Sequence, residues 1–172
     1  MARAKSTAAH TVHLTIRSPA WKRALPDVEK LAKNAALLAL SETDWPCEVS
    51  LVLSDDDEVH RLNREWRNQD KPTNVLSFPS DETEAPDGEP LLIGDVIVAF
   101  ETTRVEVVRG DAASLHDHLA HLIIHGILHL LGHDHVGDGE AERMEGIETR
   151  LLATMGIADP YAEGPHTEGK PA

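Results

Sequence analysis

A chain of 172 residues is the size of one ordinary domain, and 41% apolar residues are enough to form a hydrophobic core. The formal net charge of −14 excludes nucleic-acid binding over the whole surface, because acidic groups repel a polyanion unless a local basic patch intervenes. The sequence has no apolar run long enough to span a bilayer, and no apolar segment follows its basic start. The only cysteine, Cys47, cannot form an intrachain disulfide. We therefore expect a single-domain, cytoplasmic protein in a reducing compartment.

Apolar residues that alternate with polar ones predict the first two strands. This period-two pattern covers residues 11–16 and 47–54, and it places Cys47 in the core rather than in a reactive site. Between the two strands, Pro26 suits a first helical turn, and apolar residues recur at helical spacing from Val28 to Leu38.

The next helix is predicted to begin after residue 54 and to end near Arg67. Ser54 is expected to cap it, and the three aspartates that follow favour the positive end of the helix dipole. Its spacing predicts a buried stripe formed by Val59, Leu62 and Trp66.

The second half of the chain is predicted to contain two more strands and two more helices. The strands lie at 75–78 and 91–100, and the helices at 112–131, which ends at Gly132, and at 140–155. Strands and helices mix without a regular βαβ rhythm, so we expect an α+β fold with a small mixed sheet of about four strands packed with helices.

The folded domain is expected to cover residues 10–157, with flexible tails at 1–9 and 158–172, because the last segment has no core-forming pattern. Several acidic runs, among them residues 137–148, are interpreted as solvated loops and helix starts.

Histidines at helical spacing predict a metal site on the long helix. His121, His125 and His129 fall on one face at intervals of four, and His118 lies on the turn before them. Two adjacent imidazoles of this row can chelate one ion. The third ligand must then come from the chain after Gly132, where the backbone turns back over the helix end.

His133 and His135 are the candidates for this third ligand. His133 lies too close to the helix cap to fold back easily, whereas His135 has the reach, so we favour His135. The predicted ligands are His125, His129 and His135. Three imidazoles with one open position suit one Zn²⁺ per chain, although nickel, copper or iron would accept the same ligands.

The residue beside the first of these histidines argues against a peptidase. In the H-E-x-x-H pattern of zinc peptidases, a glutamate in that place is the general base, and here it is Gly126. Asp134 is the nearest acid to a ligand, and we expect it to orient a histidine. A metal ion can still polarise a phosphoryl oxygen or lower the pKa of bound water, and phosphoryl transfer also needs a fixed cation.

One basic cluster can supply that cation. It comprises Arg61, Arg64, Arg67 and Lys71. It is the local patch that an RNA-binding hypothesis requires in so acidic a chain. The alternative has equal weight: these arginines are solvated and pair with acids such as Glu58 and Glu65.

Three segments together resemble the YbeY family of bacterial metal-dependent endoribonucleases, also called rRNA maturation factors. They are RNQDKPTNVLSFP (67–79), LLIGDVIV (91–98) and HLIIHGILHLLGHDH (121–135). The resemblance implies an α+β fold with a zincin-like metal helix and cleavage of single-stranded RNA in 16S rRNA 3′-end maturation and ribosome quality control. The implied partners are ribosomal RNA and the small ribosomal subunit with its proteins.

The resemblance also assigns roles to individual residues. The family's metal ligands fall on His125, His129 and His135. The arginine that the family uses in catalysis falls on Arg67, and we assign Arg67 and His125 as catalytic residues. The family often has tyrosine where this chain has His133, and His121 is expected to line the site.

As a hypothesis, Arg67 binds the scissile phosphate while Ser77 and Asn74 shape the pocket. The alternative function is a ribosome-assembly binding factor whose metal is structural and which has no cleavage of its own.

Overall fold

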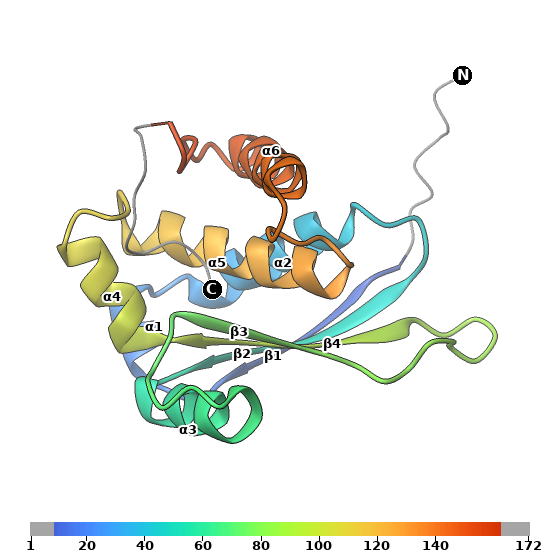
Figure 1. The fold of residues 1–172 in the computed structure, drawn as a ribbon, viewed down its shortest axis with the longest axis horizontal. Coiled ribbons are helices and arrows are strands. Elements are labelled where there is room, and N and C mark those ends of the chain that lie inside the picture. The colour runs from blue at the N-terminus through green and yellow to red at the C-terminus, as the bar shows by residue number, and fades with distance from the viewer. Residues whose placement is uncertain (1–8, 163–172) are drawn as a thin grey trace.

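The computed structural model describes residues 9–162, and its centre is a four-stranded mixed sheet (Figure 1). The strands are β1 (Thr11–Ile16), β2 (Cys47–Ser54), β3 (Val75–Pro79) and β4 (Leu91–Ala99). Their order is β1-β2-β4-β3; β1, β2 and β4 run parallel, and β3 pairs antiparallel with β4 at one edge. The edge strand β3 is the one that reaches the functional site.

Helices cover both faces of this sheet unequally. They are α1 (Ala20–Ala24), α2 (Val28–Leu40), α3 (Asp56–Arg67), α4 (Phe100–Val108), α5 (Leu115–Leu130) and α6 (Asp138–Thr154). Figure 1 shows α2 and α5 on one face, α6 outside α5, and α3 on the opposite face. The predicted α+β domain with a small mixed sheet is confirmed.

Helix α5 is the central element of the larger core. Ser114 caps its start by accepting a hydrogen bond from the Asp117 N–H, and 11 of its 16 residues, His118 to Leu128, are buried. Its apolar side chains Leu119, Ile123 and Ile127 are completely buried, and each such burial contributes about 1.5–3 kcal/mol. This packing holds the histidine row of the helix in a fixed place.

The capping residue predicted for α3 is wrong. Asp55 caps the helix by accepting a hydrogen bond from the Glu58 N–H. Ser54 cannot take this place because it is still part of β2, where it pairs with Ala99 of β4.

The predicted burial of Trp66 on α3 is also wrong. Val59 is fully buried, but Trp66 is 69% exposed. Asn63 takes the inward position of that last turn, and its side-chain amide donates to the Lys71 carbonyl at 2.9 Å. A polar side chain therefore occupies the space that the apolar stripe was expected to fill.

Two short helices are absent from the sequence prediction. Helix α1 follows β1, and α4 begins at Phe100, which was expected to end the fourth strand. Helix α4 is rich in β-branched residues and has no apolar stripe at helical spacing, so neither propensity nor periodicity indicates it. The two long helices are found with their ends shifted by up to three residues.

The remaining expectations concern Cys47 and the chain ends. Cys47 is completely buried, and burial raises the pKa of its thiol. Tyr161 lies in the segment predicted to be a flexible tail, yet its ring packs edge-on against His121 at 5.4 Å. Residues 1–8 and 163–172 lie outside the described residues, so the division into a domain and two tails stays a prediction. Over residues 9–162, none of the helices has the length and apolar character needed to cross a membrane.

Helix α5 packs closely against the sheet at Gly126. A Cβ atom there would lie 2.8 Å from a Val96 methyl group and 3.1 Å from the Ser77 hydroxyl. The Ser77 hydroxyl donates to the Gly126 carbonyl at 2.9 Å. The helix and the strands β3 and β4 therefore leave no space for a side chain at this position.

We expect Gly126→Ala to lower the free energy of unfolding by about 1–2 kcal/mol, because overpacking against Val96 outweighs the better helix propensity of alanine. The matched control is Gly146→Ala on α6, where an added Cβ meets nothing within 4 Å. The control is expected to raise the free energy of unfolding by up to about 1 kcal/mol. Urea denaturation measures both, and a stability gain in both variants would contradict the close packing.

Candidate metal centre

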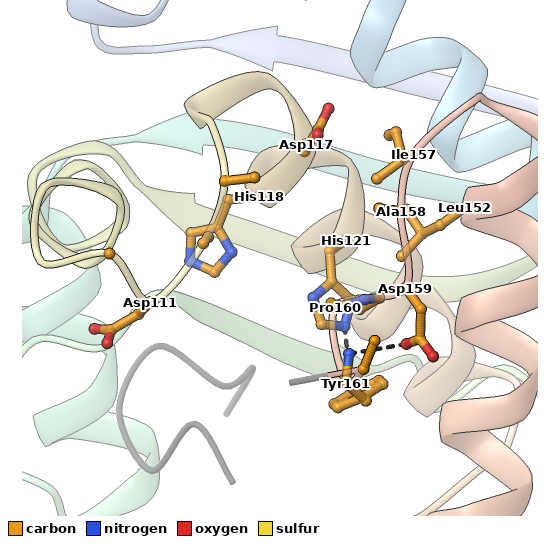
Figure 2. Close-up of a pocket in the computed structure, with 14 residues that line it drawn as sticks. Asp111, Asp117, His118, His121, Leu152, Ile157, Ala158, Asp159, Pro160 and Tyr161 are labelled. Carbon is orange, nitrogen blue, oxygen red and sulfur yellow. Dashed lines mark hydrogen bonds between the residues drawn. The ribbon is translucent and has the colours of Figure 1, made fainter. Parts of the chain in front are cut away.

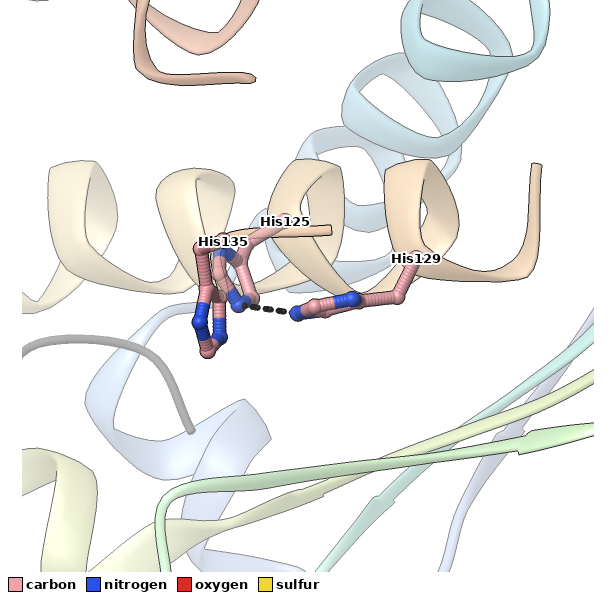
Figure 3. Close-up of side chains that lie close together, drawn as sticks. All are labelled: His125, His129 and His135. Carbon is pink, nitrogen blue, oxygen red and sulfur yellow. Dashed lines mark hydrogen bonds between the residues drawn. The ribbon is translucent and has the colours of Figure 1, made fainter. Parts of the chain in front are cut away.

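Three imidazoles form a cluster that could hold a metal ion. His125 and His129 come from α5 and His135 from the loop after it, and one ring nitrogen of each lies within 4.8 Å of the others (Figure 3). The Nε2 atoms of His125 and His129 are 2.9 Å apart. The structure brings together all three residues that the sequence predicts as ligands.

The turn after α5 brings His135 back to the helix. Gly132 has a positive φ of 98°, its N–H donates to the His129 carbonyl, and the His133 N–H donates to the Leu128 carbonyl. This is the Schellman arrangement that ends many helices at a glycine. Asp134 then accepts a hydrogen bond from the His135 N–H at 2.7 Å, which tightens the loop.

The side chain of His133 is not part of the cluster, but its carbonyl contributes to it. His129 Nδ1 donates to this carbonyl at 3.1 Å, which leaves Nε2 as the basic nitrogen on the side of the cluster. Burial and the neighbouring imidazoles of His125 and His135 lower the pKa of His129 to about 4. His129 is therefore neutral near pH 7, the state in which imidazole binds a metal.

A buried carboxylate on α6 orients His125. Glu148 is completely buried, and its carboxylate lies 2.6 Å from His125 Nδ1 and 2.8 Å from His121 Nε2. Burial by itself raises the pKa of Glu148, but the hydrogen bonds from His121 and His125 outweigh it and bring the pKa to about 2. The ionised carboxylate holds a proton on Nδ1 of His125, so that its Nε2 offers a lone pair to the cluster.

The donor set fits a divalent transition metal. Three imidazoles form a ligand set that zinc accepts, and the ionised Glu148 behind one of them partly balances the charge of a bound cation. Gly126 supplies no carboxylate beside the cluster, and the packing of α5 on the sheet excludes one there.

Arg67 and two imidazoles of the cluster, those of His129 and His135, line the same pocket. The pocket has a volume of about 430 Å³, and Arg67, Ser77, His129 and His135 are among its lining residues. The guanidinium donates to the Ser77 carbonyl on the free edge of β3 and lies 5.4 Å from the centre of the Phe78 ring. Both contacts fix the direction of the cation.

The other members of the basic cluster do not line this pocket. Arg61 forms an ion pair with Glu65 at 3.4 Å, as the alternative of acid-paired arginines predicts. Glu58, the other acid named in that alternative, pairs with Arg17. Asn74 does not line the pocket either. It is buried, and its side chain accepts from the Val75 N–H and donates to Glu106.

Glu148 is the residue that the sequence interpretation missed. The sequence pattern predicts that its segment is a solvated acidic run. It also predicts that Asp134 orients a histidine side chain, but Asp134 accepts a hydrogen bond from the backbone N–H of His135. A signal was available, because Met144, Glu148 and Leu151 share helical spacing and are all buried.

His121 lies behind the cluster and faces a second pocket. Its Nε2 contacts both Glu148 and the Tyr161 hydroxyl, and its ring lies 6.4 Å from that of His125. Figure 2 shows this pocket, about 380 Å³ in volume, with His118, His121, Asp159 and Tyr161 among its lining residues. His121 is therefore a neighbour of His125 rather than a member of the three-imidazole cluster.

Comparison with known proteins gives one consistent family. Residues 15–156 match the family model of endoribonuclease YbeY. The chain is 51% identical over 158 residues to endoribonuclease YbeY of Paramagnetospirillum magneticum, covering 88% of this chain and 96% of the relative. It is 48% identical over 167 residues to endoribonuclease YbeY of Rhodospirillum rubrum, covering 87% of this chain and 81% of the relative.

A solved structure agrees with these sequence relatives. The solution structure of TM1509 from Thermotoga maritima superimposes with a TM-score of 0.55 and 25% identity, covering 94% of this chain and 98% of the other. The family match includes β2, β3 and β4, Arg67 and the histidine cluster. The chain belongs to the endoribonuclease YbeY family.

Proposed function

We propose that the protein is a metal-dependent endoribonuclease that cuts single-stranded RNA in 16S rRNA 3′-end maturation and ribosome quality control. One observation carries the proposal: Arg67 lines the same pocket as His129 and His135, two members of the three-histidine cluster. Family membership supports the reaction class, because the relatives are named endoribonucleases.

In this proposal His125, His129 and His135 hold one metal ion, with zinc the best fit to the ligands. A bound ion would act as a Lewis acid on the phosphate or lower the pKa of an attacking water. Glu148 keeps His125 in the ligating tautomer, and the His133 carbonyl does the same for His129.

Arg67 provides the fixed cation that phosphoryl transfer needs. A guanidinium has five N–H donors, so the bond to the Ser77 carbonyl leaves others for the oxygens of a phosphate. Because Arg67 is held by Ser77 and Phe78, it needs little reorganisation as negative charge develops.

The acidic surface points to a partner that helps to deliver the RNA. A net charge of −14 weakens long-range attraction of a polyanion, so local contacts at the pocket must supply most of the binding. We infer that the small ribosomal subunit and its proteins position the rRNA strand.

Single-turnover cleavage of a single-stranded 16S rRNA 3′ fragment tests these roles. His129→Ala is expected to lose bound metal and cleavage together, whereas Arg67→Ala retains metal but cuts about 10²–10³-fold more slowly, as for loss of one charge-stabilising donor. Arg61→Ala is the matched control on the same helix, since Arg61 lies outside the pocket and pairs with Glu65. Each preparation is assayed for metal beside its cleavage rate.

Arg67→Lys separates geometry from charge in the same assay. Lysine keeps the charge but lacks the planar fork, so the variant is expected to remain slow, and a wild-type rate would contradict bidentate phosphate binding. Equal cutting by all variants would indicate a contaminating ribonuclease. If His129→Ala still lost metal in that case, the assembly factor with a structural metal would become the better account.

Glu148→Gln tests the carboxylate that supports His125. We expect zinc affinity to fall about 10–100-fold, because a neutral amide of the same shape no longer stabilises the ligating tautomer. Glu142→Gln, on the exposed side of α6, is the control and should bind zinc like the wild type. Competition with a chromophoric chelator measures both affinities, and equal values in the two variants would exclude the proposed role of Glu148.

A further inference from the structure

Trp66 is a large exposed side chain next to Arg67, a residue of the proposed site, in the sequence. It is 69% exposed and occupies the last turn of α3, immediately before Arg67. Successive residues of a helix project about 100° apart, so the indole and the guanidinium leave the helix in different directions. Arg67 lines the pocket and Trp66 is not among its lining residues. Asn63 takes the inward position of this turn, and an exposed indole contributes little to the core.

Two exposed cations lie within five residues of Trp66 along the chain. Arg64 and Lys71 are exposed, and neither forms an ion pair with any residue between 9 and 162. The two nearby acids are already engaged: the pairs are Glu65 with Arg61 and Asp70 with His60. The end of α3 is thus locally cationic on a chain whose net charge is −14.

We propose that Trp66 stacks on a base of single-stranded RNA adjacent to the phosphate that Arg67 binds. The inference rests on the proposed function and identifies how the strand is held. Every nucleobase has an aromatic face, so a tryptophan can bind single strands without sequence preference while neighbouring cations contact the phosphates. A paired base would not be available for this contact, which favours single-stranded over duplex substrates.

The charged surroundings favour RNA over an apolar protein surface as the occupant. A protein hot spot would pack the indole among apolar neighbours, whereas here Arg64, Arg67 and Lys71 surround it in the sequence. Trp45 provides the contrast: it is 58% exposed but lies in the turn between α2 and β2 beside Glu42 and Asp44. Trp45 is therefore the internal control for an exposed indole outside the basic cluster.

The test uses the zinc-loaded full chain and a 2′-O-methyl RNA octamer, with a gel to confirm that the octamer stays intact. Trp66→Ala is expected to bind the octamer about 5- to 150-fold more weakly, the range for loss of one base–aromatic stack. Trp66→Phe should keep most of the affinity, and Trp45→Ala all of it. Thermal unfolding of each variant should match the wild type, because both side chains are exposed.

Tryptophan fluorescence gives a second signature that a structural role would not produce. Stacking quenches the indole, so addition of the octamer should quench Trp45→Phe as strongly as the wild type but leave Trp66→Phe almost unchanged. The third tryptophan, Trp21, is completely buried and should report nothing.

The outcomes separate this inference from the proposed nuclease activity. Selective loss of affinity and quenching in the Trp66 variants supports stacking even if the wild type cuts no RNA, a result that would contradict only the proposed activity. Unchanged binding by Trp66→Ala, an equal loss in Trp45→Ala, or no binding by the wild type would overturn the stacking role, whether or not the protein cleaves.

Discussion

The buried carboxylate of Glu148 is the interaction on which the site depends. A charged group with no exposed surface is costly unless it is paired, and here it accepts hydrogen bonds from His121 and His125. The same contacts join α6 to α5 and reach Tyr161, whose hydroxyl also donates to the carboxylate. One side chain therefore positions an imidazole, connects two helices and draws in the chain after α6.

The close packing of α5 on the sheet sets the second constraint. Because Gly126 has no side chain, β3 can approach the helix, and Ser77 bridges the two through its hydroxyl. The carbonyl of the same serine holds Arg67 at the edge of the pocket. The close packing at Gly126 leaves no space for the glutamate that a zinc peptidase has at this position. The bond to Ser77 instead holds a guanidinium beside the imidazoles, an arrangement suited to phosphate chemistry.

Local patterns predict the elements with strong periodicity and fail where long-range contacts decide. Strands β1 and β2 and helices α2 and α5 follow their apolar spacing, and the reach of the chain after Gly132 places His135 in the cluster. Glu148 lies 23 residues from His125 in an acidic run, so its burial depends on how α6 packs. Trp66 fits the apolar spacing of α3 but is 69% exposed, because Asn63 occupies the inward position there. Whether the cluster binds metal stays a prediction.

Removal and stepwise return of the metal tests the central claim most directly. The protein is stripped with a chelator, zinc is returned in measured steps, and cleavage of the single-stranded rRNA 3′ fragment is followed at each step. If the three imidazoles hold the ion needed for cleavage, activity is absent from the stripped protein and reaches its plateau when one zinc ion is bound per chain. Full cleavage by protein that retains no measurable metal would contradict the account.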